Sequence, residues 1–311
     1  MNTPVSQRTH IDGFDLIRVL AVIGIVTFHF GPDALSTLGY SGLPAFIIMS
    51  FSLQSSSPRA NNFAAITARR AQRLLVPWAA WSLIYAAVYY WLHRHQPITL
   101  DIVWSDLFVG YSIHLWYLVF AFIATLILAL IQTQTQGWRR RSTTLLLLAL
   151  GGTAATLLAL KNALGLHHLP APWPQWLFGL PGLFFGAALG MTYHANDRQT
   201  RRYRATIVFF AIASTLFVLY AGNAHDALAY VIAIAAVYAA LEIKLPPSPT
   251  LRYLASLTFG TYLAHYFVYL AILSCSRGQL TNQWAILALT IFLTSIAISA
   301  AQRIPYLRRI V

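Results

Sequence analysis

Long apolar runs alternate with short polar stretches along nearly the whole chain of 311 residues. A helix needs about 20 consecutive apolar residues to cross the hydrocarbon core of a bilayer. Ten runs approach that length, and we expect helices over residues 14–30, 38–54, 76–92, 113–132, 143–161, 175–192, 205–221, 227–243, 254–273 and 284–302. The pattern predicts an all-α, polytopic membrane protein with about ten transmembrane helices.

The composition excludes a large soluble protein as the source of these runs. Hydrophobic residues make up 58% of the chain and charged residues 9%, whereas soluble domains carry about 25% charged residues. Cys275 is the single cysteine, which excludes an internal disulfide and a cysteine-based metal cluster. The longest connections, 55–75 and 93–112, are too short for a soluble domain, so we expect residues 1–311 to form a single integral-membrane domain.

Positive charge alternates between successive connections. The net charge of +13 would suit nucleic acid, but 18 of the 21 lysines and arginines fall on one side of the predicted helices, and the other three are Arg94, Lys161 and Arg277. This split follows the positive-inside rule and predicts that both termini are cytoplasmic, with no nucleic-acid partner. The outer connections 93–112 and 162–176 contain Trp, Pro and His. They fit either a vestibule or interfacial loops anchored by tryptophan.

The first predicted helix carries three ionisable side chains, Asp15, Arg18 and His29. Arg18 and His29 are eleven residues apart, which places them on one helix face and about 16 Å apart along the axis. Asp15 precedes Arg18 by three residues and can pair with it. An arginine near a helix end often anchors in the membrane interface, but ionisable groups at membrane depth usually face a cavity and serve a function.

A second basic group, Arg69, Arg70 and Arg73, falls on an amphipathic stretch before a helix that we expect to start near Pro77. Arg70 and Arg73 are one turn apart and share a face. Two interpretations fit this spacing equally well. The arginines either contact lipid headgroups or form a phosphate site, because guanidinium groups bind phosphate oxygens in a bidentate manner.

Two further polar groups interrupt the apolar segments: His114, Trp116 and Tyr117 at the start of the fourth helix, and Tyr262 and His265 one turn apart on the ninth. Each group alone fits an interfacial aromatic belt. Together with the histidine of the first helix, they give three histidines at membrane level. Their spacing matches no metal-binding motif, so we expect no metal. Because histidine is well suited to proton transfer near neutral pH, a general base explains the first of them better than an anchor.

In combination, these segments resemble the membrane acyltransferase 3 family, bacterial enzymes that O-acylate exported sugars. "FDLIRVLAVIGIVTFHF" is similar to the family's first helix, and "PAFIIMSFSL", which contains Ser50, is similar to its second-helix motif. "RRAQRLLVPWAAWS" is similar to its arginine motif, and "HLWYL" and "FGTYLAH" are similar to its fourth-helix and near-terminal motifs. The resemblance covers nearly the full length of the chain.

The resemblance implies an O-acyltransferase of the bacterial inner membrane. It would transfer an acyl group, most simply acetyl from acetyl-CoA, to a hydroxyl of an exported or lipid-linked saccharide, with membrane lipid as a further partner. It carries a catalytic role onto His29, supported by Arg18 and Asp15. Donor binding is expected at Arg69, Arg70, Arg73 and Ser50, and acceptor binding at His114, Trp116, Tyr117, Tyr262 and His265.

The residues alone leave two other classes of function open. A secondary transporter or a lipid or saccharide flippase would use His29 and Arg18 as a relay, although the sequence shows no internal repeat or matching pair of broken helices. A regulatory membrane protein would bind acyl-CoA or lipid without turnover. Acyl transfer by the purified protein separates the enzyme from both alternatives.

Overall fold

The computed structural model describes residues 11–56, 63–92, 106–193 and 198–311, and these residues form helices joined by loops, without a strand. The long helices are α1 (Asp12–Phe30), α3 (Gly42–Ser56), α4 (Phe63–Leu92), α6 (Trp116–Gln134), α7 (Arg140–Ala159), α8 (Trp173–Gly190), α9 (Arg198–Tyr220), α10 (Ala224–Glu242), α11 (Pro249–Cys275) and α12 (Gln283–Ala301). The short helices are η1 (Asp33–Leu35), α2 (Ser36–Tyr40), α5 (Asp106–Val109), η2 (Ile113–Leu115), η3 (Leu166–His168) and η4 (Leu307–Arg309). Each long helix overlaps one of the ten predicted segments, so the all-α prediction is confirmed.

Within the described ranges, nine spans are long and apolar enough to cross a membrane, with η1, α2 and α3 counted as one span over Asp33–Ser56. The remaining long helix, α8, has 18 residues and begins with two tryptophans, a proline and a glutamine, and it is not among these spans. Its second half is buried against the rest of the protein. The chain is therefore a polytopic membrane protein, and the one long helix outside these nine spans lies inside the bundle.

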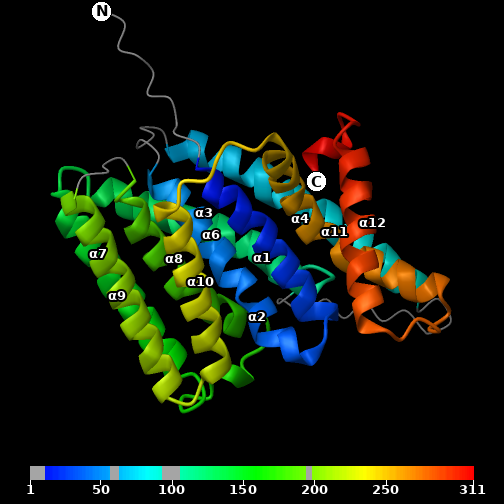
Figure 1. Ribbon diagram of the computed structural model, residues 1–311, viewed down its shortest axis with the longest axis horizontal. Helices are drawn as coiled ribbons and strands as arrows, with labels where there is room; N and C mark the ends of the chain where they lie inside the picture. Colours follow the sequence, from blue (N-terminus) through cyan, green and yellow to red (C-terminus); the bar gives the residue numbers. More distant parts are fainter. Residues whose placement is uncertain (1–10, 57–62, 93–105, 194–197) are drawn as a thin grey trace, which may run out of the picture.

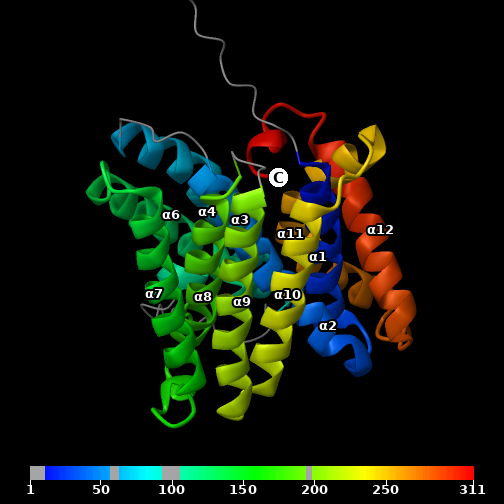
Figure 2. The same cartoon turned by 60° about the vertical axis from the view of Figure 1, so that its left-hand side comes forward.

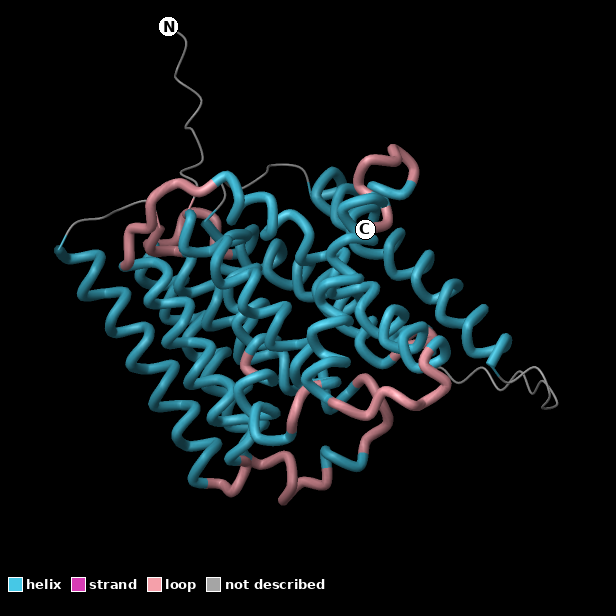
Figure 3. Tube along the Cα trace, turned by 45° about the vertical axis from the view of Figure 1, so that its right-hand side comes forward, coloured by secondary structure: helices cyan, strands magenta, loops and turns pink. Residues whose placement is uncertain are grey.

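The helices form one bundle in which α7, α8, α9 and α10 lie toward one side and α11 and α12 toward the other (Figure 1). Figure 2 shows the same order from another direction, with α1 beside α10 and α11. Loops gather at the two ends of the bundle (Figure 3). Because α1 packs against α2, α3, α10, α11 and α12, the helix that carries Arg18 and His29 has protein on most of its sides.

Ion pairs lie at both ends of the bundle. At one end, Arg252 near the start of α11 bonds Asp12 at the start of α1, with 3.1 Å between Nη2 and Oδ1. At the opposite end, Lys161 after α7 pairs with Asp226 near the start of α10. We call the first the arginine end. The second is the histidine end, because α1 reaches it at His29.

Helix α4 differs from the prediction. It is one helix of 30 residues, and Pro77 lies inside it, where the sequence predicted a helix start. A proline removes one backbone hydrogen bond from a helix, and here the ring is buried among neighbours, so tertiary packing outweighs that loss. Arg69, Arg70 and Arg73 therefore stand on the helix itself. Of the two long predicted connections, residues 57–62 and 93–105 lie outside the described residues.

Helices α3 and α8 approach so closely that two positions of α8 have no room for a side chain. A Cβ atom added at Gly186 would lie 2.4 Å from the backbone oxygen of Ile48, and one at Gly190 would lie 2.1 Å from that of Ser52. The Ser52 hydroxyl donates a hydrogen bond of 2.9 Å to the Gly186 carbonyl. Small residues at four-residue spacing allow membrane helices to pack backbone to backbone. This seam holds α3, and with it Ser50, in a fixed register.

The packing between α1, α11 and α12 is looser than that between α3 and α8. An apolar cavity of about 160 Å³ lies between α1, α11 and α12, lined by side chains that include Val19, Val26, Leu257 and Ile291. The lining residues of α1 come from the stretch between Arg18 and His29.

We predict that the arginine end faces the cytoplasm. Cysteines introduced at Arg140 and His168, both exposed, should then react differently with an impermeant thiol reagent. In a Cys275→Ser background, which removes the single native cysteine, the reagent should label position 168 in intact cells and position 140 only after permeabilisation. Equal labelling of both positions in intact cells would contradict the orientation.

Candidate active site

An ion pair within α1 orients Arg18 at the arginine end of the molecule. Its Nη1 lies 3.3 Å from Oδ1 of Asp15, one turn earlier on the helix, as the spacing predicted. The carboxylate side chain is 4% exposed, whereas that of the arginine is 36% exposed. A buried carboxylate that holds a more accessible guanidinium group restricts its orientation and leaves some of its N–H donors for another partner.

The arginines of α4 approach the same place. Arg73 lies close enough to Arg18 for their two positive charges to repel each other, and Arg70 lies close enough to Tyr117 for its charge to act on the phenol. Arg70 is half-buried and Arg73 is exposed. Three guanidinium groups from two helices therefore gather at one end of the bundle, and we call Arg18, Arg70 and Arg73 the arginine group.

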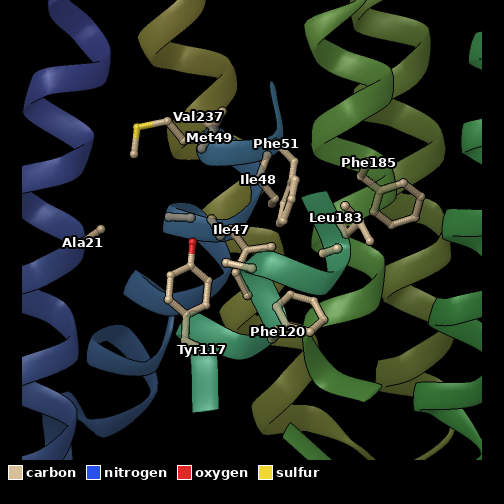
Figure 4. Close-up of a cluster of buried hydrophobic side chains, with 14 of the residues drawn as sticks. Ala21, Ile47, Ile48, Met49, Phe51, Tyr117, Phe120, Leu183, Phe185 and Val237 are labelled. Carbon is tan, nitrogen blue, oxygen red and sulfur yellow. The ribbon is translucent and has the colours of Figure 1, made fainter. Parts of the chain in front are cut away.

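Tyr117 stands between the arginine group and the opposite end of the bundle. Its hydroxyl donates a long hydrogen bond of 3.5 Å to the Ser50 hydroxyl on α3, and Figure 4 shows the tyrosine pointing toward that helix. Its ring centroid lies 5.8 Å from that of Tyr262 on α11. The Tyr262 ring in turn lies 5.7 Å from His114 and 6.1 Å from His265. Ring contacts thus connect Tyr117, on which the charge of Arg70 acts, to the histidines.

The three histidines that the sequence singled out lie together at the histidine end. The ring centroids of His29 and His265 are 5.3 Å apart, and those of His114 and His265 are 4.9 Å apart. They come from α1, η2 and α11. His114 and His265 are 5% and 0% exposed, whereas His29 is exposed. In this histidine cluster, His29 is the exposed ring.

A tyrosine that the sequence analysis missed supports the cluster. The Tyr85 hydroxyl on α4 donates to the Leu263 carbonyl at 2.8 Å and accepts from the Phe267 N–H at 3.2 Å. Its ring lies 5.3 Å from that of His114. A signal was present, because fifteen residues at 100° each place this tyrosine about 60° from Arg70 on the helix.

Two predicted site residues make contacts outside the arginine group and the histidine cluster. Arg69 is exposed, and its Nε donates to the Ala65 carbonyl of its own helix at 3.1 Å. Trp116 is buried against Phe120, with 5.6 Å between the ring centroids. Among the residues that the structure describes, no group of three His, Cys, Asp or Glu side chains is arranged to hold a metal ion.

The family model for acyltransferase 3, described as an acyltransferase domain, matches residues 11–301. The chain belongs to this family. Searches of curated proteins and of solved structures give no significant match. Membership makes the protein a multi-pass membrane acyltransferase and favours an enzyme over the transporter and the regulatory protein.

Proposed function

We propose that this acyltransferase moves an acyl group, most simply acetyl, from cytosolic acyl-CoA to a saccharide hydroxyl on the other side of the bacterial inner membrane. The supporting observation is the arrangement along α1. The arginine group lies at one end and the histidine cluster at the other, on a helix face that spans about 16 Å between Arg18 and His29. With the arginine end facing the cytoplasm, as predicted above, the cations would meet the anionic donor and the histidines would meet the acceptor.

The donor fits the arginine group by charge and by shape. The nucleotide end of acyl-CoA carries phosphates, and guanidinium groups bind phosphate oxygens with paired, charge-assisted hydrogen bonds. The long, neutral pantetheine arm would then extend past Ser50 and Tyr117 toward the histidine end. The alternative, a lipid headgroup on the same arginines, offers phosphate without a thioester. Substitution of these arginines separates the two ligands, because it weakens CoA binding only if the arginines bind CoA.

An acceptor sugar fits the rings beside His29. Phe28 lies 5.2 Å from this histidine and 4.8 Å from Tyr40 on α2, and Tyr40 stacks on His225 at 4.6 Å. Phe28 and His225 are exposed and Tyr40 is half-buried, so this aromatic row offers open ring faces on which a sugar ring can pack. The five acceptor residues predicted from the sequence are at most 5% exposed. Such buried residues are better suited to line or support the acceptor site than to form its open binding surface.

His29 would act as the general base in the chemical step. The acceptor oxygen attacks the thioester carbonyl carbon while the imidazole takes the hydroxyl proton. The tetrahedral oxyanion then collapses, the carbon–sulfur bond breaks, and the proton passes to the departing CoA thiolate. Tyrosine hydroxyls, arginine side chains or backbone N–H groups would stabilise the oxyanion. Transfer through a transient acyl-histidine is chemically equivalent overall. Rapid-quench labelling with a radioactive acyl group distinguishes this route from direct transfer.

The purified protein in nanodiscs, supplied with radiolabelled acetyl-CoA and extracted cell glycans, tests the proposal. We expect release of free CoA and label in the saccharide fraction, and we expect surface glycans to lose acetyl groups in cells without the gene. Label found only in lipid would contradict a saccharide acceptor. Intact acetyl-CoA in the presence of every acceptor fraction would contradict the donor.

A further inference from the structure

The hydrogen bonds of His265 determine which of its ring nitrogens carries the proton. On α11, its Nδ1 lies 2.6 Å from the backbone oxygen of Tyr262. A carbonyl only accepts hydrogen bonds, so Nδ1 carries the proton. In a neutral imidazole the other nitrogen is then an acceptor. That Nε2 atom is buried and has no hydrogen-bond partner among the described residues. Buried polar atoms are rarely left without partners, because this costs stability.

His114 cannot supply the missing partner. Its Nε2 lies 3.3 Å from the Leu263 carbonyl and therefore donates, and its Nδ1 lies 2.8 Å from the Ser112 hydroxyl and therefore accepts. Both nitrogens are thus occupied, with the opposite tautomer to that of His265. The ring is a fixed wall of the cluster.

The Tyr262 hydroxyl, on the other polar ring beside His265, donates to the His114 carbonyl, which leaves His29 as the donor. Its ring lies 5.3 Å from that of His265, centroid to centroid, with 31° between the planes. A nitrogen–nitrogen hydrogen bond of about 3 Å between facing ring edges needs centroids about 5 Å apart, so a small rotation of the exposed His29 side chain completes the bond. Phe30, the other α1 ring against His265, lies at 5.8 Å and offers no polar donor. Catalytic hydrogen bonds often tighten only when substrate is bound.

Building on the proposed function, we infer that His265 is a positioning residue whose Nε2 accepts an N–H from His29. This bond fixes the tautomer of His29, so that its other nitrogen is the free acceptor for the sugar hydroxyl. When His29 takes that proton, the shared N–H becomes charge-assisted and strengthens. The added proton stays on His29 until it passes to the departing thiolate. A buried neutral imidazole thus does the work that a carboxylate does in a serine protease triad.

Two substitutions separate the acceptor atom from the fold. In His265→Asn, the short amide can still donate to the Tyr262 carbonyl, but it places nothing at the position of Nε2. In His265→Gln, the longer side chain can place an amide oxygen there. We expect the asparagine variant to lower kcat by about ten- to a hundredfold, the value of one charge-assisted hydrogen bond, with an unchanged KM for acyl-CoA. The glutamine variant should keep more of the rate.

Nitrogen-15 spectra of the full-length protein, labelled at histidine in nanodiscs, give a readout that needs no turnover. We expect a single His29 tautomer in the wild type and a mixture in His265→Asn. A folded asparagine variant with wild-type kcat and one His29 tautomer would overturn the inference. So would a folded glutamine variant that is no better than asparagine. If the wild type itself transfers no acyl group, the proposed function fails, and a tautomer mixture in the wild type still overturns the inference independently.

Discussion

Replacement of His29 by alanine is expected to lower kcat by a factor of about 10² to 10⁴ while leaving acyl-CoA binding largely intact. General bases contribute roughly this much, and the phosphate contacts lie about three helical turns away. Steady-state kinetics together with a CoA binding isotherm measure the two quantities separately. His168→Ala is a matched control, since this exposed histidine lies in η3, apart from the histidine cluster.

The opposite result is equally informative. A structural histidine would lower expression or thermal stability, and the residual activity would scale with the folded fraction. A well-folded His29→Ala protein that retains more than about a tenth of normal turnover is incompatible with general-base catalysis of that size. Catalysis would then have to be sought at His265, because both ring nitrogens of His114 are occupied.

The rate of the wild type should fall as the pH is lowered through the titration of His29. An imidazolium has no lone pair with which to take the hydroxyl proton, so protonation removes the base. The expected profile of log kcat against pH has a slope of about one on its acidic limb. A flat profile over a pH range in which the protein stays folded would argue against this role.

Removal of either Arg70 or Arg73 should weaken CoA binding about ten- to a hundredfold, because each charge-assisted hydrogen bond contributes roughly 1.5–3 kcal/mol. Isothermal calorimetry on the purified Ala variants measures the loss. Arg139→Ala is a matched control, since this exposed arginine precedes α7, away from the arginine group. Arg70→Lys is the finer probe, because lysine keeps the charge but loses the planar fork. Unchanged binding in both Ala variants would assign the arginines to lipid headgroups.

Much of the fold follows from hydropathy, because helices that cross a bilayer must satisfy their backbone hydrogen bonds internally. The pairing of Asp15 with Arg18 was equally accessible, since three-residue spacing on a helix is local geometry. The continuation of α4 through Pro77 could not be predicted from the sequence. Proline ends many helices, and only the packing around the ring decides whether the helix continues.

The site was predictable in its parts and not in its assembly. His29, His114 and His265 stand out as polar residues in apolar segments, but their convergence depends on how α1, η2 and α11 pack. The same holds for the hydrogen-bond partners of each ring nitrogen, which sequence spacing does not contain. Tyr85 was missed because its hydroxyl partners are backbone groups of α11, which sequence spacing on α4 does not contain.

The contrast between the α3–α8 seam and the cavity beside α1 gives the molecule a stiff half and a compliant half. Where backbones touch at Gly186 and Gly190, sliding by even one residue would drive Cβ atoms into carbonyl oxygens, so that interface has a single register. Between α1, α11 and α12, side chains separate the helices and already leave about 160 Å³ of space. We expect breathing motions to be concentrated there. In hydrogen exchange, α12 should lose protection well before α8, and a bulky side chain at Thr258, which lines that cavity, should stiffen the compliant half while leaving the seam unchanged.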